Sequence, residues 1–200
     1  YMVTRAMRAF KEGVNTLKEF DKALTTISYT MNLSEDKLQN MGKQALQMAS
    51  DLSLSMENIM SIYQIYSNMN TSVEEIKTQA EPTAILSNLT GVDASTAADQ
   101  IQGVINQFNL KSEDAMHVAD VYDYISKNIA VDYSKGIEGM AAAVQDVGNV
   151  AYNAGLNFEQ LSGIIAKVME QTRQSGSSIG TGLKTILTRI SKSSKMSDEV

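Results

Sequence analysis

The chain has 200 residues, with one proline, no cysteine, no tryptophan and a formal net charge of −6. This negative balance leaves no basic surplus with which to neutralise a phosphate backbone, which argues against a sequence-specific nucleic-acid binder. The missing cysteines exclude disulfides and thiol nucleophiles, and the longest apolar run, Met140 to Val144, is far shorter than the roughly 20 residues of a membrane-spanning helix.

The single proline and the twelve methionines indicate long helices that pack through adaptable, unbranched side chains. A hydrophobic content of 43% is ordinary for a globular chain and too high for a disordered one. We predict an all-α fold, a multi-helix bundle of stacked helical hairpins with a long, coiled-coil-like N-terminal helix. Methionines at helical spacing beside leucine and isoleucine indicate core filling, with a Met-rich binding groove as the alternative.

Residues 2–31 place apolar side chains at gaps of four and three, a heptad-like seam over about four repeats. This pattern has two interpretations: a long amphipathic helix that lies on the following bundle, or a helix that self-associates along the seam. The second interpretation predicts a homo-oligomer. The predicted seam residues are Val3, Met7, Phe10, Val14, Leu17 and Leu24.

From Leu33 onward a capping residue repeatedly precedes an apolar helical stripe. Thr71 with Glu74, and Asn157 with Gln160, have the spacing of a capping box, in which two side chains satisfy free backbone N–H groups. The recurrence at intervals of roughly 20 residues is consistent with stacked hairpins. The predicted caps are Ser34, Ser55, Thr71, Asp93, Ser112, Asp132 and Asn157.

Pro82, the only proline, falls inside the helical pattern that starts at Val73. Proline lacks a backbone donor, and its ring clashes with the preceding turn. We therefore predict a kink or break within three residues of Pro82.

The stretch from Ser175 to Ile190 begins with glycines and small hydroxyl residues and continues as a helix with one apolar stripe from Ile179 onward. It predicts a flexible entry into a helix. The glycine spacing matches neither a P-loop nor a dinucleotide-binding loop, which argues against a phosphate site. No stripe follows Ile190, so we expect an N-terminal helix over 1–31, a helical core bundle over 32–190, and a linker or frayed end over 191–200.

His117, the only histidine, is surrounded at helical spacing by Glu113, Asp114 and Asp120. Zinc sites use several His or Cys ligands, so one histidine among carboxylates favours a solvated acidic face. No nucleophile-elbow motif is present, and capping explains the acidic residues at helix starts. We predict no catalytic, cofactor-binding or metal-binding residues.

The segment Gly182-Leu-Lys-Thr-Ile-Leu-Thr-Arg-Ile190 resembles the closing signature of the core region of phage tail tape measure proteins. Weaker likenesses are Phe20-Asp-Lys-Ala-Leu24, the run from Glu74 to Pro82, and Val118-Ala-Asp-Val121. The resemblance covers roughly Phe20 to Ile190. It implies that the family signature consists of a hinge followed by a helix. The residues of this hinge and helix are Gly180, Gly182, Leu183, Ile186, Leu187, Arg189 and Ile190.

This resemblance implies a structural, non-enzymatic protein of a bacteriophage tail. Such a protein lies in the tail lumen of the virion, sets tail length during assembly in the host cytoplasm, and leaves the tail ahead of the DNA. Its implied partners are tail tube, tail tip and tail assembly chaperone proteins. A helical protein-binding or signalling module, whose Met-rich groove accepts a partner helix, is the alternative function.

Overall fold

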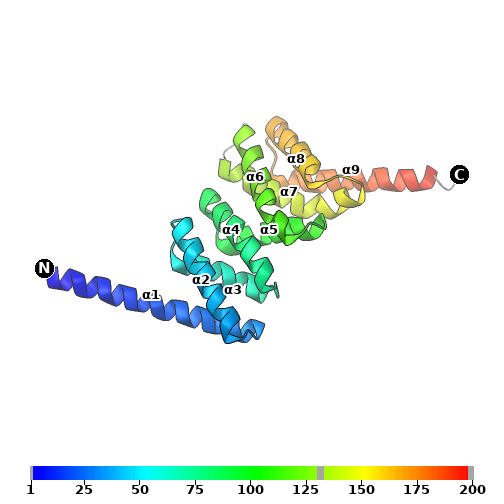
Figure 1. The fold of residues 1–200 in the computed structure, drawn as a ribbon. Helices are drawn as coiled ribbons and strands as arrows, with labels where there is room; N and C mark the ends of the chain where they lie inside the picture. The colour runs from blue at the N-terminus through cyan, green and yellow to red at the C-terminus, as the bar shows by residue number, and fades with distance from the viewer. Residues whose placement is uncertain (1, 130–132, 198–200) are drawn as a thin grey trace. The chain divides into compact units, whose positions relative to one another are not determined.

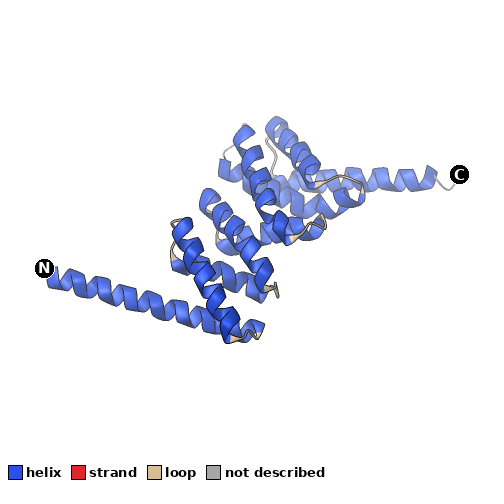
Figure 2. Cartoon of the chain, viewed as in Figure 1, coloured by secondary structure: helices blue, strands red, loops and turns tan. Residues whose placement is uncertain are grey.

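The computed structural model describes residues 2–129 and 133–197, with side chains described over 15–129 and 135–192. The predicted all-α fold is confirmed, and the described residues contain helices and no strand (Figure 2). None of the described helices is long and apolar enough to span a bilayer. Backbone contacts divide the chain into two compact units, Tyr1–Ile85 and Leu86–Val200.

The division into two units differs from the single bundle expected over residues 32–190. The boundary falls inside one helix, because the first part of that helix packs in the first unit and Leu86 joins the hydrophobic cluster of the second. The C-terminal boundary also differs. The last helix continues to Ser197, past the expected end at Ile190.

The first unit consists of α1 (Met2–Met31), α2 (Glu35–Asp51), α3 (Met56–Asn68) and most of α4 (Val73–Thr90) (Figure 1). The C-terminal half of α1 packs on α3 and α2, where Ala23 and Ile27 are buried. Gly42 on α2 lets α1 and α2 approach each other closely, since a Cβ at this position would lie 3.1 Å from Leu24 Cδ1 on α1. The N-terminal half of α1 extends beyond these contacts (Figure 1).

Helix α4 runs without interruption through Pro82, so of the two predicted alternatives the break is wrong and the kink stays a prediction. An interior proline costs a helix about 3 kcal/mol. Burial offsets this cost here, because Pro82 and its neighbours Thr83 and Ala84 are all buried. The hydroxyls of Thr83 and Tyr66 on α3 also form a buried hydrogen bond of 2.6 Å, which ties α4 to α3 at the residue after the proline.

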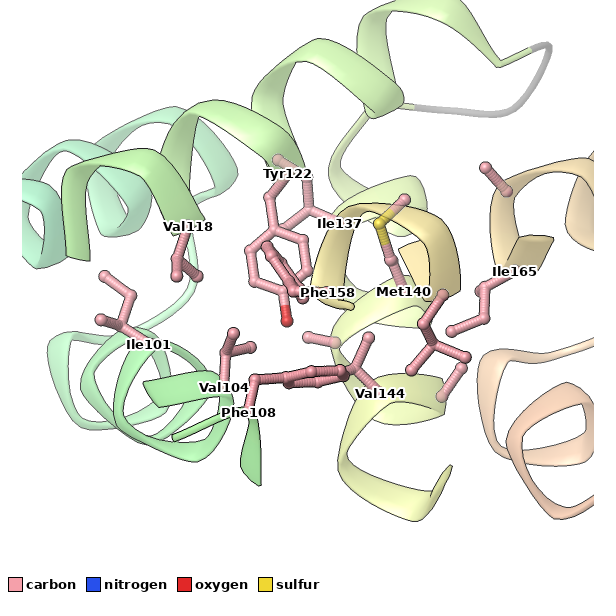
Figure 3. Packing of buried hydrophobic residues seen from close by; sticks show 14 of the residues in the cluster. Ile101, Val104, Phe108, Val118, Tyr122, Ile137, Met140, Val144, Phe158 and Ile165 are labelled. Atoms are coloured by element: carbon pink, nitrogen blue, oxygen red, sulfur yellow. The ribbon is translucent and has the colours of Figure 1, made fainter. Parts of the chain in front are cut away.

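The second unit contains α5 (Ala94–Gln107), the short 3-10 helix η1 (Ser112–Asp114), α6 (Ala115–Asn128), α7 (Tyr133–Asn153), α8 (Phe158–Thr172) and α9 (Gly176–Ser197). Its core is centred on Phe158, whose ring lies edge-on to those of Tyr122 and Phe108 at centroid distances of 5.5 and 5.7 Å (Figure 3). Aliphatic side chains from α5, α7 and α8 surround this cluster.

Three predicted caps are confirmed. The side chains of Ser55 and Asp93 accept hydrogen bonds from backbone N–H groups three residues later. Asn157 and Gln160 form the predicted reciprocal box, with bonds of 2.8 and 3.0 Å. Each such bond lies within one helical turn, which is why the local pattern predicts it.

Other caps differ from the prediction. The box at the start of α4 uses Ser72 and Glu75, one residue later than Thr71 and Glu74, and the hydrogen bonds from Ser72 lower the pKa of Glu75. Ser34 occupies the cap position of α2 without a side-chain bond. At η1 the side chain of Asp114 accepts from the N–H of Lys111, in place of the predicted cap Ser112. Asp132 lies outside the described residues.

Candidate functional site

Helix α9 lies along α7 with very close backbone contact (Figure 1). A Cβ added to Gly176 would overlap the carbonyl oxygen of Gly139. A Cβ added to Gly180 would lie 2.8 Å from the carbonyl oxygen of Ala143, closer than real Cβ atoms approach. The two helices therefore touch through backbone atoms, which only glycine permits at these positions of α9.

The glycine-rich entry to the signature helix is itself helical in the structure, and the hinge at this position stays a prediction. Helix α9 begins at Gly176, and the Ser175 hydroxyl accepts a hydrogen bond of 3.3 Å from the N–H of Ser178. Gly180 and Gly182 both lie inside the helix, and neither has a positive φ. Gly182 is exposed, and an added Cβ there would meet nothing within 4 Å. Packing on α7 keeps this glycine-rich segment helical despite its low helix propensity.

The apolar signature residues of α9 divide into two groups. Leu183 and Leu187 are half-buried against the core of the second unit. Ile186 and Ile190 are 54% and 59% exposed. Arg189 is exposed beside them. The exposed end of α9 thus keeps an apolar stripe that its own unit does not cover.

The predicted seam on α1 is also divided. Leu24 packs within the first unit against Gly42, and it therefore belongs to the packing of that unit. Leu17 is 67% exposed. The other predicted seam residues, Val3, Met7, Phe10 and Val14, lie outside the residues whose side chains are described. Of the two interpretations of residues 2–31, an amphipathic helix that lies on the following helices describes the C-terminal half of α1 alone.

A groove of about 630 Å³ lies between α1 and α3 in the first unit. Met56 and Met60 line it together with polar side chains such as Glu19 and Gln64. Other methionines, including Met41, Met140 and Met169, are buried, as core filling predicts. The lining of this groove is therefore mixed polar and apolar, and it is not the Met-rich groove of the alternative function.

Residues 42–200 match the family model of phage-related minor tail proteins. The chain belongs to this family. A tape measure protein of Pneumococcus phage Dp-1 is 25% identical over 177 residues, which cover 88% of this chain and 15% of that protein. The predicted resemblance to phage tail tape measure proteins is confirmed. No solved structure matches the chain.

The match places this minor tail protein among structural components of phage tails, and it includes all of α9 with its signature. Helix α1 precedes the matched residues. The chain spans about 15% of the length of the tape measure relative. What it shares with that relative is therefore a segment of a much longer protein.

His117 forms a hydrogen bond with Glu159 in this minor tail protein, with 2.6 Å between Nε2 and Oε1. This hydrogen bond lowers the pKa of Glu159. The pair joins α6 to α8 and both side chains are about half exposed. Among the described residues, no three His or carboxylate groups gather as a metal site. The sequence pattern missed Glu159 because it lies far along the chain from His117.

Proposed function

We propose that this chain is a compact assembly or ejection module of a tape measure protein, and that the length-measuring part lies elsewhere. The observation that carries this proposal is the folding of α2 to α9 into two compact units in a chain of the minor tail protein family. Long helices, such as α1 and others outside this chain, would then measure the tail.

The physical argument concerns contour length. An extended helix spans about 1.5 Å per residue, so a chain of this size in one helix would measure at most about 300 Å. Helices that fold back to bury their apolar faces use little of that length. A folded bundle is therefore a poor ruler, and its stability must serve another step of tail assembly or genome delivery.

The remaining parts of the proposal concern location and partners. The protein lies in the tail lumen of the virion, is assembled in the host cytoplasm, and contacts tail tube, tail tip and tail assembly chaperone proteins. It sets tail length as part of the complete protein and leaves the tail ahead of the DNA. It acts structurally, without a catalytic site or a cofactor.

Deleting the α2–α3 hairpin, residues 35–68, from the complete protein in its phage is expected to abolish assembly or infection. The deletion exposes the apolar faces of α1 and α4 that the hairpin covers. Plaque counts and electron micrographs of the particles measure the outcome. Infectious phage whose tails are shorter by about 1.5 Å per deleted residue would show instead that the region is a ruler.

A matched control keeps the length and weakens the fold of the second unit. Phe158→Ala removes the central ring of the second core and deletes no residue. We expect it to impair assembly or infection as the deletion does. Normal numbers of infectious particles from this variant, after the loss of stability of the second unit has been verified in the purified chain, would contradict an essential compact module.

We also propose that the N-terminal half of α1 self-associates through the seam from Val3 to Leu17. Replacing Phe10 and Leu17 with glutamate is expected to lower the oligomer mass in light scattering, because burial of each large side chain contributes about 1.5 to 3 kcal/mol. Thr25→Glu with Thr30→Glu, at exposed positions of α1 outside the seam, is the control. A monomeric wild type and an equally stable seam variant would show that the seam is neither interface nor core.

A further inference from the structure

The hairpin of α2 and α3 in the first unit has a counterpart in the second unit, the hairpin of α7 and α8. One turn residue in each has a positive φ, 53° at Ser53 and 87° at Gly155. The leucine after it donates its N–H to the carbonyl oxygen of a buried alanine five residues earlier, at 3.0 Å in both hairpins. Such turns are common at helix ends, so the neighbouring side chains decide whether the likeness goes further.

The side chains that follow the two turns match as well. Ser55 and Asn157 cap α3 and α8, and each accepts a hydrogen bond from the backbone N–H three residues later. After the cap, α3 continues with Met-Glu-Asn-Ile over residues 56–59, and α8 continues with Phe-Glu-Gln-Leu over residues 158–161. The last residue of each four, Ile59 or Leu161, is buried. The same number of residues separates every pair of matching positions, which indicates a repeated hairpin.

The helix after each hairpin also begins in the same way. The hydroxyls of Ser72 before α4 and Ser175 before α9 each accept a hydrogen bond of 3.3 Å from the N–H three residues later. Four residues after each serine an isoleucine is buried, Ile76 on α4 and Ile179 on α9. Helices α4 and α9 are therefore equivalent elements of the two units.

These equivalent helices differ in how far their stripes are covered. The stripe of α4 is buried at Ile76, Ala80, Thr83 and Ala84. The matching positions of α9 are Ile179, Leu183, Ile186 and Leu187, and the stripe continues at Ile190. Of these, Ile186 and Ile190 are 54% and 59% exposed. The helix with the more apolar stripe is thus the one whose stripe is less covered.

Residues that follow α4 in the chain cover its C-terminal end. The second unit begins at Leu86, which lies in the same hydrophobic cluster as Ala97 and Ile101 of α5. Thr90, the last residue of α4, is also buried. Helix α4 therefore begins in one unit and ends as the first element of the next.

We propose that α9 does the same: its exposed end begins a further helical unit, and residues that follow Val200 in the complete protein cover it. The tape measure relative is far longer than this chain, so a protein of this kind has the residues to do so. The covering element is an amphipathic helix whose apolar side packs on Ile186 and Ile190, as α5 packs on the end of α4. Lys184 and Lys192 lie on the opposite face of α9 and stay in solvent. This contact is separate from the seam on α1.

Cysteine labelling tests the proposal, because the 200 residues contain no cysteine. Ile190→Cys is introduced into the complete protein and into the same protein ended at Val200. Mass spectrometry of the peptide that contains the new thiol measures its rate of reaction with a maleimide. We expect a rate at least tenfold lower in the complete protein. Tenfold dilution should leave that rate unchanged, because the cover belongs to the same chain.

Lys192→Cys, on the opposite face of α9, is the matched control, and its rate should differ by less than twofold between the two proteins. A second measurement needs no substitution in α9. The backbone amides of residues 186–192 should exchange at least tenfold more slowly in the complete protein, because burial suppresses local opening.

Three results would overturn the proposal. The first is an equal labelling rate for Ile190→Cys in the two proteins together with unchanged amide exchange. The second is equal protection of both cysteines, since the cover would then not be specific to the apolar face. The third is protection of Ile190→Cys that is lost on dilution, since a second copy would then be the occupant.

Discussion

Phe158→Ala is expected to destabilise the second unit by about 3 to 5 kcal/mol, the usual cost of truncating a buried phenylalanine. The Phe158 side chain is 2% exposed, and its ring packs edge-on against Phe108 and Tyr122. Truncation therefore removes two aromatic contacts and leaves a cavity among residues of three helices. Close-packed neighbours collapse into such a cavity only partly, which is why the cost exceeds the transfer free energy of the ring.

Urea unfolding followed by far-ultraviolet circular dichroism measures this effect. Two units with separate cores allow two transitions, and we expect the variant to shift the transition of the second unit alone. Tyr124→Ala is the matched control, because Tyr124 lies on the exposed face of α6 in the same unit. Its expected effect is within about 0.5 kcal/mol. Equal effects of the two substitutions would contradict the central position of Phe158 in the core.

Replacing Gly176 or Gly180 with alanine is expected to lower the stability of the second unit by about 1 to 3 kcal/mol for each substitution. The added methyl groups would collide with backbone carbonyl oxygens of Gly139 and Ala143. A flexible side chain could turn away from such a collision, but the backbone of α7 cannot. The helices would have to separate, with loss of contacts along their whole length.

Gly182→Ala provides the comparison within the same helix. No atom lies within 4 Å of the position that the added Cβ would take. Alanine also has the higher helix propensity, so this substitution should stabilise the unit by about 0.5 to 1 kcal/mol. Urea unfolding of the three single variants measures the sign of each effect. A stabilisation by alanine at all three positions would show that α9 does not lie against α7 as closely as the structure has it.

Local patterns in the sequence predicted much of the fold. The caps at Asp93 and Asn157 are predictable because each bond joins groups within one turn of the chain. The all-α class follows from helical periodicity over most of the chain. The same local reasoning predicted a kink or a break at Pro82, and the break is absent because burial around the residue offsets the cost that the proline would have in an isolated helix.

The candidate site was predicted less completely. The glycine-rich segment before Ile179 predicts flexibility from its composition, but packing on α7 makes it the start of a helix. The seam on α1 predicts one continuous face, yet only the structure shows that Leu24 packs in the first unit while Leu17 stays exposed. Periodicity shows which side chains share a face, and it does not show how far along that face a partner extends.

The sequence alone determined the helical class, several helix starts and the likeness to phage tail proteins, because these depend on residues close together in the chain. Tertiary structure alone decided the division at Ile85 and Leu86, the pairing of His117 with Glu159, and the difference between Gly180 and Gly182. The two glycines are equivalent in composition and lie in one helix. They differ because the backbone of α7 lies against the first and solvent lies beside the second.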